Sequence, residues 1–179
     1  MSSVELITGF LCLLFLLFLI VAALGKSEWE IAEEIKILRP SQDVWDYIRY
    51  LKNSAYYNKW VMTDPGMQKT FTGTDGTIGF IYSWDSKQMS VGKGDQEIIH
   101  LLEGSKVDYQ IRFKKPFEAT SYSAIILTRI SDKQTNVCWT FKSRNSFMMK
   151  VLHLALNLKK GLKKDLQASL QNLKVILEQ

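Results

Sequence analysis

The sequence predicts an α+β domain in which one antiparallel sheet wraps around a long helix at the C-terminal end of the chain. Residues 146–179 contain no Pro, and Leu recurs there every three or four positions, which is the period of one helix face. The preceding roughly one hundred residues consist of short alternating segments separated by turn residues, as in a sheet with one core face. The apolar stripe of the helix must be buried, and the sheet offers the surface that can bury it.

Composition limits the classes of function. Cys12 and Cys138 are the only cysteines, one in an apolar run and one in an expected strand, so neither a disulfide nor a cysteine metal site is predicted. The chain has 23 Lys and Arg against 18 Asp and Glu. We interpret this surplus as solvating charge and predict no nucleic-acid partner, with attraction to anionic lipid as the alternative interpretation.

Residues 6–24 carry no charge and are dominated by Leu and Phe. At about 1.5 Å per residue a helix of this length nearly spans a hydrocarbon core of about 30 Å. We therefore expect residues 1–25 to form an uncleaved transmembrane anchor. A cleaved signal peptide with its site near Ala23 is the alternative. Basic residues follow this segment and none precedes it, which predicts a single-pass membrane protein with its C-terminal domain in the cytoplasm.

Residues 26–179 are expected to form the folded domain. A first alternating strand is predicted at residues 29–37, followed by a short helix with Ser41 as its N-cap and a second short helical piece at residues 54–60. Gly, Pro, Asp and Ser clusters then separate six further strands. We predict these strands at residues 67–72, 77–85, 93–102, 106–114, 119–130 and 136–143.

One face of the predicted sheet is rich in aromatic residues. In residues 106–114 every second side chain is apolar, including Tyr109 and Phe113, while charged or polar residues stand between them. Large inward-facing rings on other strands continue the pattern: Tyr82, Trp84, Trp139 and Phe141. Such rings can fill a core completely, or they can line an apolar ligand cavity between sheet and helix.

The segment TDGTIGFIYSWDSKQMSVGKGDQEI, residues 74–98, resembles the polyketide cyclase/dehydrase and lipid transport family of the START-like (SRPBCC) superfamily. The likeness rests on a strand rising to Trp84, a polar turn, and then Val91, Gly92 and Gly94 before an apolar strand. RPSQDVWDYI, NKW, IRFKKPF and SLQNLKVILE add weaker similarities in the same order. The chain departs from the family pattern at Ser169, where relatives tend to have Gly.

The resemblance implies the helix-grip fold, in which a curved antiparallel sheet of about seven strands holds a long C-terminal helix with an apolar cavity between them. It implies binding of a lipid or another hydrophobic small molecule more than it implies catalysis. Fold alone does not decide function. An enzyme acting on a hydrophobic or polyketide-like ligand and a protein-interaction domain with a filled core therefore remain the alternatives.

No catalytic or cofactor site can be recognised in the sequence. His100 and His153 have no Cys, Asp or Glu at metal-ligand spacing. The glycines at positions 73, 76, 79, 92 and 94 do not lead into a helix N-terminus, so they are interpreted as turn glycines rather than a phosphate loop. We therefore predict no metal, no cofactor and no catalytic set.

The predicted ligand site combines the inward rings with the start of the long helix. Two polar residues are added because they fall on otherwise apolar faces: Glu33 and Lys159 would contact a polar head group, or alternatively pair with neighbours at the rim. The full set of predicted ligand-binding residues is Tyr82, Trp84, Tyr109, Phe113, Trp139, Phe141, Met148, Leu152, Glu33 and Lys159.

Overall fold

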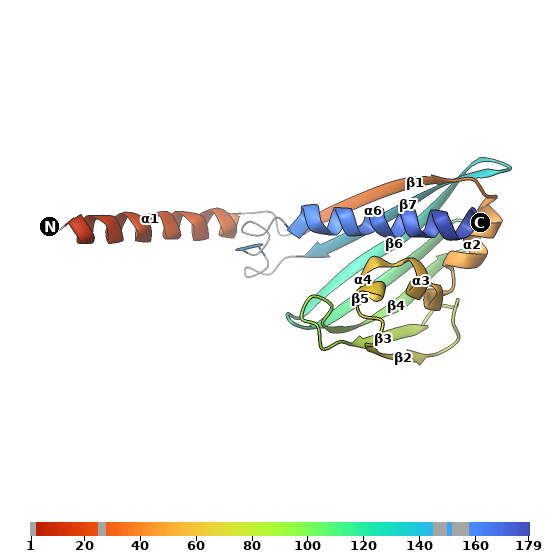
Figure 1. The fold of residues 1–179 in the computed structure, drawn as a ribbon, viewed down its shortest axis with the longest axis horizontal. Coiled ribbons are helices and arrows are strands. Elements are labelled where there is room, and N and C mark those ends of the chain that lie inside the picture. Colours follow the sequence, from red (N-terminus) through yellow and green to blue (C-terminus); the bar gives the residue numbers. More distant parts are fainter. Residues whose placement is uncertain (1–2, 25–27, 145–149, 152–157) are drawn as a thin grey trace.

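The computed structural model describes residues 3–24, 28–144, 150–151 and 158–179, and within the first helix the side chains of residues 4–20 and 23–24. Within these residues the main body is a seven-stranded antiparallel sheet in the order β1-β7-β6-β5-β4-β3-β2. The C-terminal helix lies along one face of the sheet, and the short helices lie beside it toward the β2 edge (Figure 1). The predicted sheet and its arrangement around a terminal helix are confirmed.

Strand boundaries follow the alternation in the sequence closely, with one exception. The strand predicted at residues 77–85 begins only at Ile81, because Gly76 and Gly79 adopt φ angles of 78° and 86°, which belong to turns. The first strand pairs with the last strand of the sequence, so the first and second strands form the two edges of the sheet. The strands are β1 (Glu28–Ile37), β2 (Gln68–Thr72), β3 (Ile81–Asp85), β4 (Lys93–Leu102), β5 (Lys106–Lys115), β6 (Ala119–Ser131) and β7 (Gln134–Arg144).

Four short helical pieces connect β1 to β2: α2 (Ser41–Ile48), η1 (Leu51–Asn53), α3 (Ser54–Tyr57) and α4 (Lys59–Thr63). The apolar side of α2 is fully buried, as its spacing predicts. The predicted N-cap is wrong by one position. Pro40 is the N-cap, and it makes no side-chain hydrogen bond to the helix. Ser41 is instead the first helical residue.

Helix α6 (Leu158–Leu177) supplies the apolar stripe that closes the core. Leu166, Leu170 and Leu173 are at most 1% exposed. The C-terminal end of the helix is tied to the end of β1, since Glu178 accepts a hydrogen bond from the Leu38 backbone amide at 2.6 Å. The N-terminal part of the predicted helix lies mostly outside the described residues, although residues 150–151 are helical.

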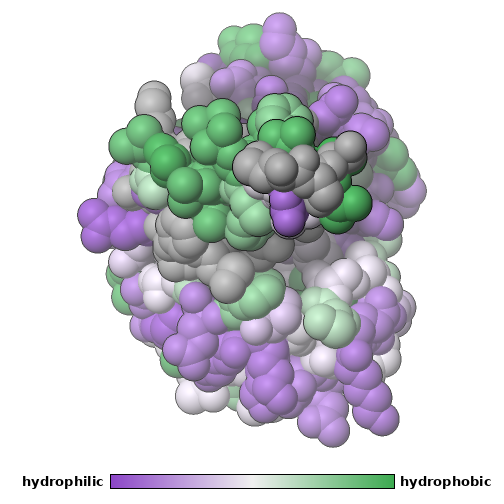
Figure 2. Space-filling model, turned by 90° about the vertical axis from the view of Figure 1, so that its left-hand side faces the viewer, coloured by the Kyte–Doolittle hydropathy of each residue, from purple (hydrophilic) through white to green (hydrophobic). Residues whose placement is uncertain are grey.

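Helix α1 (Ser3–Leu24) extends away from the sheet (Figure 1). Most of its Leu, Ile and Phe side chains are exposed. Seen from the end of the molecule that carries the helix, hydrophobic side chains gather above the centre and hydrophilic ones predominate in the lower part (Figure 2). In the part of the chain that the structure describes, however, no helix combines the length and apolar character needed to cross a membrane.

This finding corrects the predicted location of the protein. A bilayer core requires about 20 consecutive apolar residues. The predicted transmembrane anchor at residues 6–24 is therefore not supported, and the predicted single-pass membrane location with a cytoplasmic domain is overturned.

Candidate ligand-binding cavity

The concave face of the sheet does not fill the interior completely. A partly open cavity of about 210 Å³ remains between strands β3 to β7 and the helices α4 and α6. Most of its lining is aromatic or aliphatic, and among the described lining residues none is a Lys, Arg, Asp, Glu or His. The described lining residues are Asn58, Trp60, Val61, Met67, Tyr82, Trp84, Ser90, Val91, Gln96, Ile111, Phe113, Ser123, Trp139, Phe141 and Leu162.

Strand register brings the lining residues of the sheet together. Tyr82 on β3 is the register partner of Gln96 on β4, and Gln96 is in turn the partner of Ile111 on β5. Ser123 on β6 is the partner of Phe141 on β7. Since side chains opposite one another in adjacent strands share a face, residues distant in sequence form one continuous floor.

The aromatic wall depends on a strand position without a side chain. Trp84 on β3 and Phe113 on β5 flank Gly94 on β4, and their rings meet edge to face at 6.0 Å between centroids. A Cβ atom on Gly94 would lie 2.6 Å from Cζ2 of Trp84 and 2.5 Å from the backbone oxygen of Arg112. Glycine at this position therefore lets the indole cross β4 and reach the third strand.

The loop between β3 and β4 holds the same indole from its other end. The Trp84 Nε1 group donates a hydrogen bond to the Val91 carbonyl at 3.2 Å. Gly92 has a φ angle of 65°, and a Cβ atom there would overlap the backbone oxygen of Lys115. The Val-Gly-Lys-Gly segment thus has a physical role, because both of its glycines allow close approaches that position Trp84.

Helices α4 and α6 form the opposite wall and are joined through Ser169. This residue is fully buried on α6, and its hydroxyl accepts a hydrogen bond from the Lys59 amide at 2.9 Å while donating to the Asp165 carbonyl at 2.7 Å. The Asp165 carboxylate also accepts a hydrogen bond from Trp60, and burial raises its pKa above the usual value. Serine at this position therefore fits a fully buried contact between the two helices and joins them through its hydroxyl.

Most polar atoms in the cavity already have protein partners. The Trp139 indole donates to the Ser123 hydroxyl at 2.8 Å, and Ser123 donates to the Thr140 carbonyl at 2.8 Å. The side-chain oxygen Oδ1 of Asn58 accepts a hydrogen bond from the Trp60 backbone amide at 3.0 Å, which caps α4. These bonds fix the wall and leave those donors occupied.

Not every polar group of the lining has such a partner. The Tyr82 hydroxyl is buried and has no hydrogen-bond partner among the described residues, although Tyr82 as a whole is only 4% exposed. Burial raises the pKa of this phenol well above its usual value, so the hydroxyl keeps its proton at neutral pH. The neighbouring Gln96 amide is half-buried and likewise makes no hydrogen bond within the described part of the chain.

The structure assembles five of the predicted ligand residues in the lining: Tyr82, Trp84, Phe113, Trp139 and Phe141. Tyr109 shares their face of the sheet but lies deeper, 1% exposed, with its hydroxyl 3.5 Å from the Ile48 carbonyl oxygen under α2. Met148 and Leu152 lie outside the described residues.

The two predicted polar contacts lie elsewhere. Glu33 forms an ion pair with Lys163 of α6 at 3.0 Å. Lys159 is exposed and borders a shallow groove beside β1, together with Glu30 and Lys163. Neither side chain contributes to the lining of the cavity described here.

Several lining residues were not anticipated, and Gln96 is the most informative. It shares the parity of Gly94 and Ile98 on β4, so its inward position follows from the alternation of that strand. The helical residues Val61 and Leu162 could not be placed in the same way, because their contribution depends on how α4 and α6 dock on the sheet.

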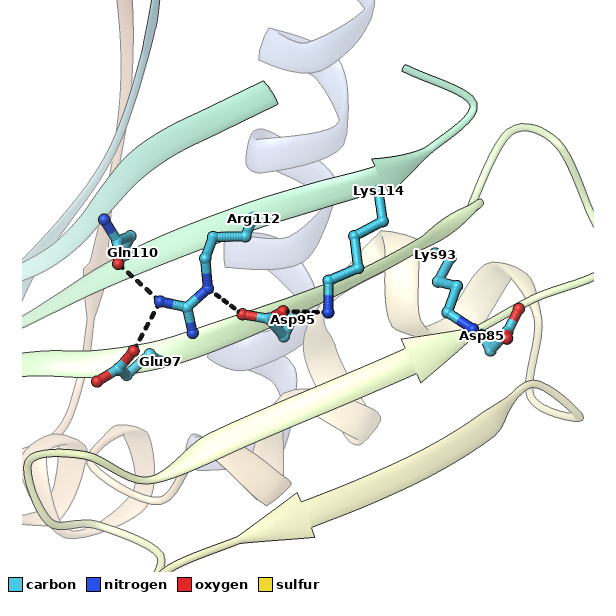
Figure 3. A network of polar contacts seen from close by, with 7 residues as sticks. All are labelled: Asp85, Lys93, Asp95, Glu97, Gln110, Arg112 and Lys114. Carbon is cyan, nitrogen blue, oxygen red and sulfur yellow. Dashed lines mark hydrogen bonds and ion pairs between the residues drawn. The ribbon is translucent and has the colours of Figure 1, made fainter. Parts of the chain in front are cut away.

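Charged residues occupy the opposite face of the sheet. Arg112 on β5 lies between two carboxylates of β4, and it contacts Asp95 as well as Glu97, the latter at 2.8 Å (Figure 3). Asp95 also pairs with Lys114 at 2.9 Å. Each charge in this network has a partner, so we interpret it as a support that holds β4 and β5 in register behind the cavity.

Among the described residues no group of His, Cys, Asp and Glu is arranged to hold a metal ion.

No protein-family model matches the chain, and no curated protein matches its sequence. Solved structures do match its fold. Truncated norcoclaurine synthase from Thalictrum flavum has a TM-score of 0.62 at 12% identity, covering 85% of this chain and 95% of that one. Protein CV1439 from Chromobacterium violaceum has a TM-score of 0.59 at 15% identity, covering 84% and 97%.

The Aha1 protein from Colwellia psychrerythraea, solved as a dimer, matches with a TM-score of 0.58 at 14% identity, covering 84% of this chain and 96% of that one. At such identities the likeness establishes the fold alone. The chain has the helix-grip fold, in which a curved antiparallel sheet holds a C-terminal helix.

Proposed function

We propose that residues 26–179 form a domain that binds a hydrophobic small molecule in the cavity between the sheet and α6. The observation that carries this proposal is the cavity itself: about 210 Å³ of space, bounded by aromatic and aliphatic side chains on the concave face of a helix-grip fold. Ligand sites are typically apolar with a few placed polar groups, and this lining has that composition. We also propose that the chain is related to the polyketide cyclase/dehydrase and lipid transport family.

Two alternatives receive less support. A protein-interaction domain with a filled core would not need an unfilled aromatic cavity. Enzymatic activity would need a nucleophile or an acid–base pair at the cavity. The described lining contains no carboxylate, histidine or cysteine, and its only strongly perturbed titratable group is the protonated Tyr82. The proposed role is therefore binding or transfer of the ligand.

A titration with a fluorescent hydrophobe tests the proposal. The full chain is titrated with N-phenyl-1-naphthylamine, and dye emission is followed together with the melting midpoint. A saturable site should raise the midpoint as the dye passes its dissociation constant, because the ligand binds only the folded state. A structure with a closed interior, or no saturable binding across a panel of neutral hydrophobes, would contradict the proposal.

Two variants on the same helix locate the binding site. Leu162→Trp places a larger ring into the cavity from α6 and should weaken dye binding at least about tenfold. Val175→Trp makes a similar change at a residue that is 50% exposed and lies outside the lining, so dye affinity should stay unchanged. Equal affinities for both variants would show that the dye binds elsewhere, for example on the exposed side chains of α1.

A further inference from the structure

The loop between β3 and β4, residues 86–92, supplies the exposed part of the described cavity wall. Resting on the proposed binding function, we infer that the ligand enters and leaves past this loop, and that the hydrogen bond between Ser86 and Asp64 sets the rate of exchange. Three observations lead to this inference: where the lining is exposed, how the ends of the loop are fixed, and what holds its middle.

The first observation is the position of the exposed lining. Ser90 of the loop is the one exposed residue among the described lining residues, and the adjacent Val91 is half-buried. Met89, which precedes them, is 79% exposed. By contrast, the lining residues Tyr82 and Trp139 are each only 4% exposed. In the described part of the chain, the mouth of the cavity therefore lies at this loop.

The second observation is that both ends of the loop are fixed. Asp85 at the end of β3 forms an ion pair with Lys93 at the start of β4 (Figure 3). Directly inside this pair, the Ser86 amide donates a hydrogen bond to the Gly92 carbonyl at 2.9 Å. The backbone of Gly92 also packs closely against the backbone oxygen of Lys115. Any opening of the loop is therefore confined to the residues between these anchors.

The third observation concerns the middle of the loop. Residues 87–90 are four consecutive exposed residues, and segments that bury little surface open at a low cost in free energy. Among the described contacts, one side-chain hydrogen bond joins the loop to the connection between α4 and β2. In this bond, which we call the latch, the Ser86 hydroxyl donates to the Asp64 carboxylate at 2.5 Å.

Asp64 connects the loop to two other segments of the cavity wall. It is the C-cap residue of α4, which contributes Val61 to the lining. Its backbone carbonyl accepts a hydrogen bond from the amide of Met67, another lining residue, at 3.2 Å. Loss of the latch would therefore release the loop from both segments without removing any side chain of the lining.

A contact that is present both with and without ligand controls rates rather than affinity. Its loss raises the open fraction of the free and the loaded protein by the same factor, so association and dissociation accelerate together and Kd is unchanged. Hydrogen bonds to an ionised group are among the stronger ones, but Ser86 and Asp64 are both only half-buried. We therefore expect an acceleration of about tenfold when the latch is removed.

Stopped-flow fluorescence of dye exchange tests the inference. The full chain is mixed with N-phenyl-1-naphthylamine to measure association, and the loaded chain is diluted to measure dissociation. An equilibrium titration gives Kd independently. Ser86→Ala should raise both rate constants about tenfold and change Kd by less than about twofold.

Ser131→Ala is the matched control for the loss of a turn hydroxyl. The Ser131 hydroxyl accepts a hydrogen bond from the amide two residues later, that of Lys133, at 3.3 Å. The Ser86 hydroxyl accepts one in the same way from Gln88 at 2.9 Å. Ser131 lies in the turn between β6 and β7 and outside the described lining, so its variant should exchange dye at the wild-type rates. Equal acceleration in both variants would overturn the inference.

A double-mutant cycle assigns the effect to the pair. Asp64→Ala should accelerate exchange about as much as Ser86→Ala, and the double variant should be no faster than either single variant, because both changes remove the same hydrogen bond. Accelerations that multiply in the double variant would show two independent effects and would overturn the role of the latch.

The remaining outcomes separate this inference from the proposed function. If the wild type binds no dye in the cavity, as judged with Leu162→Trp, the binding function itself fails. If the cavity binds dye but Ser86→Ala exchanges it at the wild-type rates, the ligand enters elsewhere and the inference is wrong. If only dissociation accelerates, so that Kd rises by the same factor, Ser86 supports the bound ligand instead of controlling its entry, which also overturns the inference.

Discussion

Replacing Gly94 by alanine is the most direct test of how the cavity wall is built. The added methyl group would lie 2.5 Å from the Arg112 backbone oxygen and 2.6 Å from Trp84 Cζ2. Ordinary contacts between such atoms are about 3.5–4.0 Å, so both neighbours would have to move by roughly 1 Å. The carbonyl belongs to the paired strand β5 and cannot move freely, which leaves the indole to be displaced.

The energetic consequence can be worked out from the contacts that are lost. Overpacking of this kind typically costs about 1–3 kcal/mol. Displacing Trp84 would also weaken its edge-to-face contact with Phe113, a contact type worth about 0.5–1.5 kcal/mol. Its hydrogen bond to the Val91 carbonyl contributes about 0.5–1.5 kcal/mol more. These contributions overlap, and we expect a total loss of about 2–5 kcal/mol in the free energy of unfolding.

Urea unfolding followed by circular dichroism measures this loss, and Gly66→Ala provides the control. Gly66 does not have a positive φ angle, and an added Cβ would lie 3.7 Å from the Asp64 carboxylate, which is ordinary contact. We expect the control to unfold near the wild-type midpoint, and Gly94→Ala to unfold at a clearly lower urea concentration and to bind the naphthylamine dye more weakly. If Gly94→Ala and Gly66→Ala have equal midpoints, the proposed crossing of Trp84 over β4 is wrong.

Three further predictions concern α6. Leu166→Ala removes a fully buried side chain and should lower the free energy of unfolding by about 2–5 kcal/mol. Lys164→Ala, on the exposed face of the same helix, should change it by less than about 0.5 kcal/mol. Equal urea midpoints for the two variants would contradict the assigned helix face. Gly161→Ala meets no atom within 4 Å and should stabilise the protein by about 0.5–1 kcal/mol through helix propensity, which a thermal melt can check. The hydrogen bond from the Leu38 amide, with help from Lys174, lowers the pKa of Glu178. Its stabilisation is therefore complete above the ordinary carboxyl pKa of about 4.3 and is lost as pH falls through the lower folded value, so Glu178→Gln should show a shallower loss of stability in acid than the wild type.

The sheet could be predicted from the sequence because its strands obey a simple period. Alternation along residues 93–102 and 106–114 fixes which side chains share a face, and the observed strands match these boundaries to within one residue. The position of the core helix follows from its stripe of Leu residues in the same way. Where local backbone geometry mattered, as at Gly79 and Pro40, the pattern gave boundaries that were slightly wrong.

The cavity was harder to predict, because the period of a strand gives the face of a residue but not its depth. Tyr109 and Phe113 lie on the same face of β5, yet one is covered by α2 while the other borders the cavity. The difference depends on where the helices dock along the strands, and that depends on contacts distant in sequence such as Ser169 with Lys59. Likewise, the pairing of Glu33 with Lys163 depends on the rotation of α6 against β1.

The hydrogen bonds of the cavity wall connect its architecture to the proposed binding function. The indoles of Trp84 and Trp139 both donate to protein acceptors, so they act as fixed apolar surfaces. The hydroxyl of Tyr82, whose register partner is Gln96, is buried and has no hydrogen-bond partner among the described residues. A core selected only for stability would gain from a phenylalanine at position 82, because the unpaired hydroxyl carries a desolvation cost without a compensating bond.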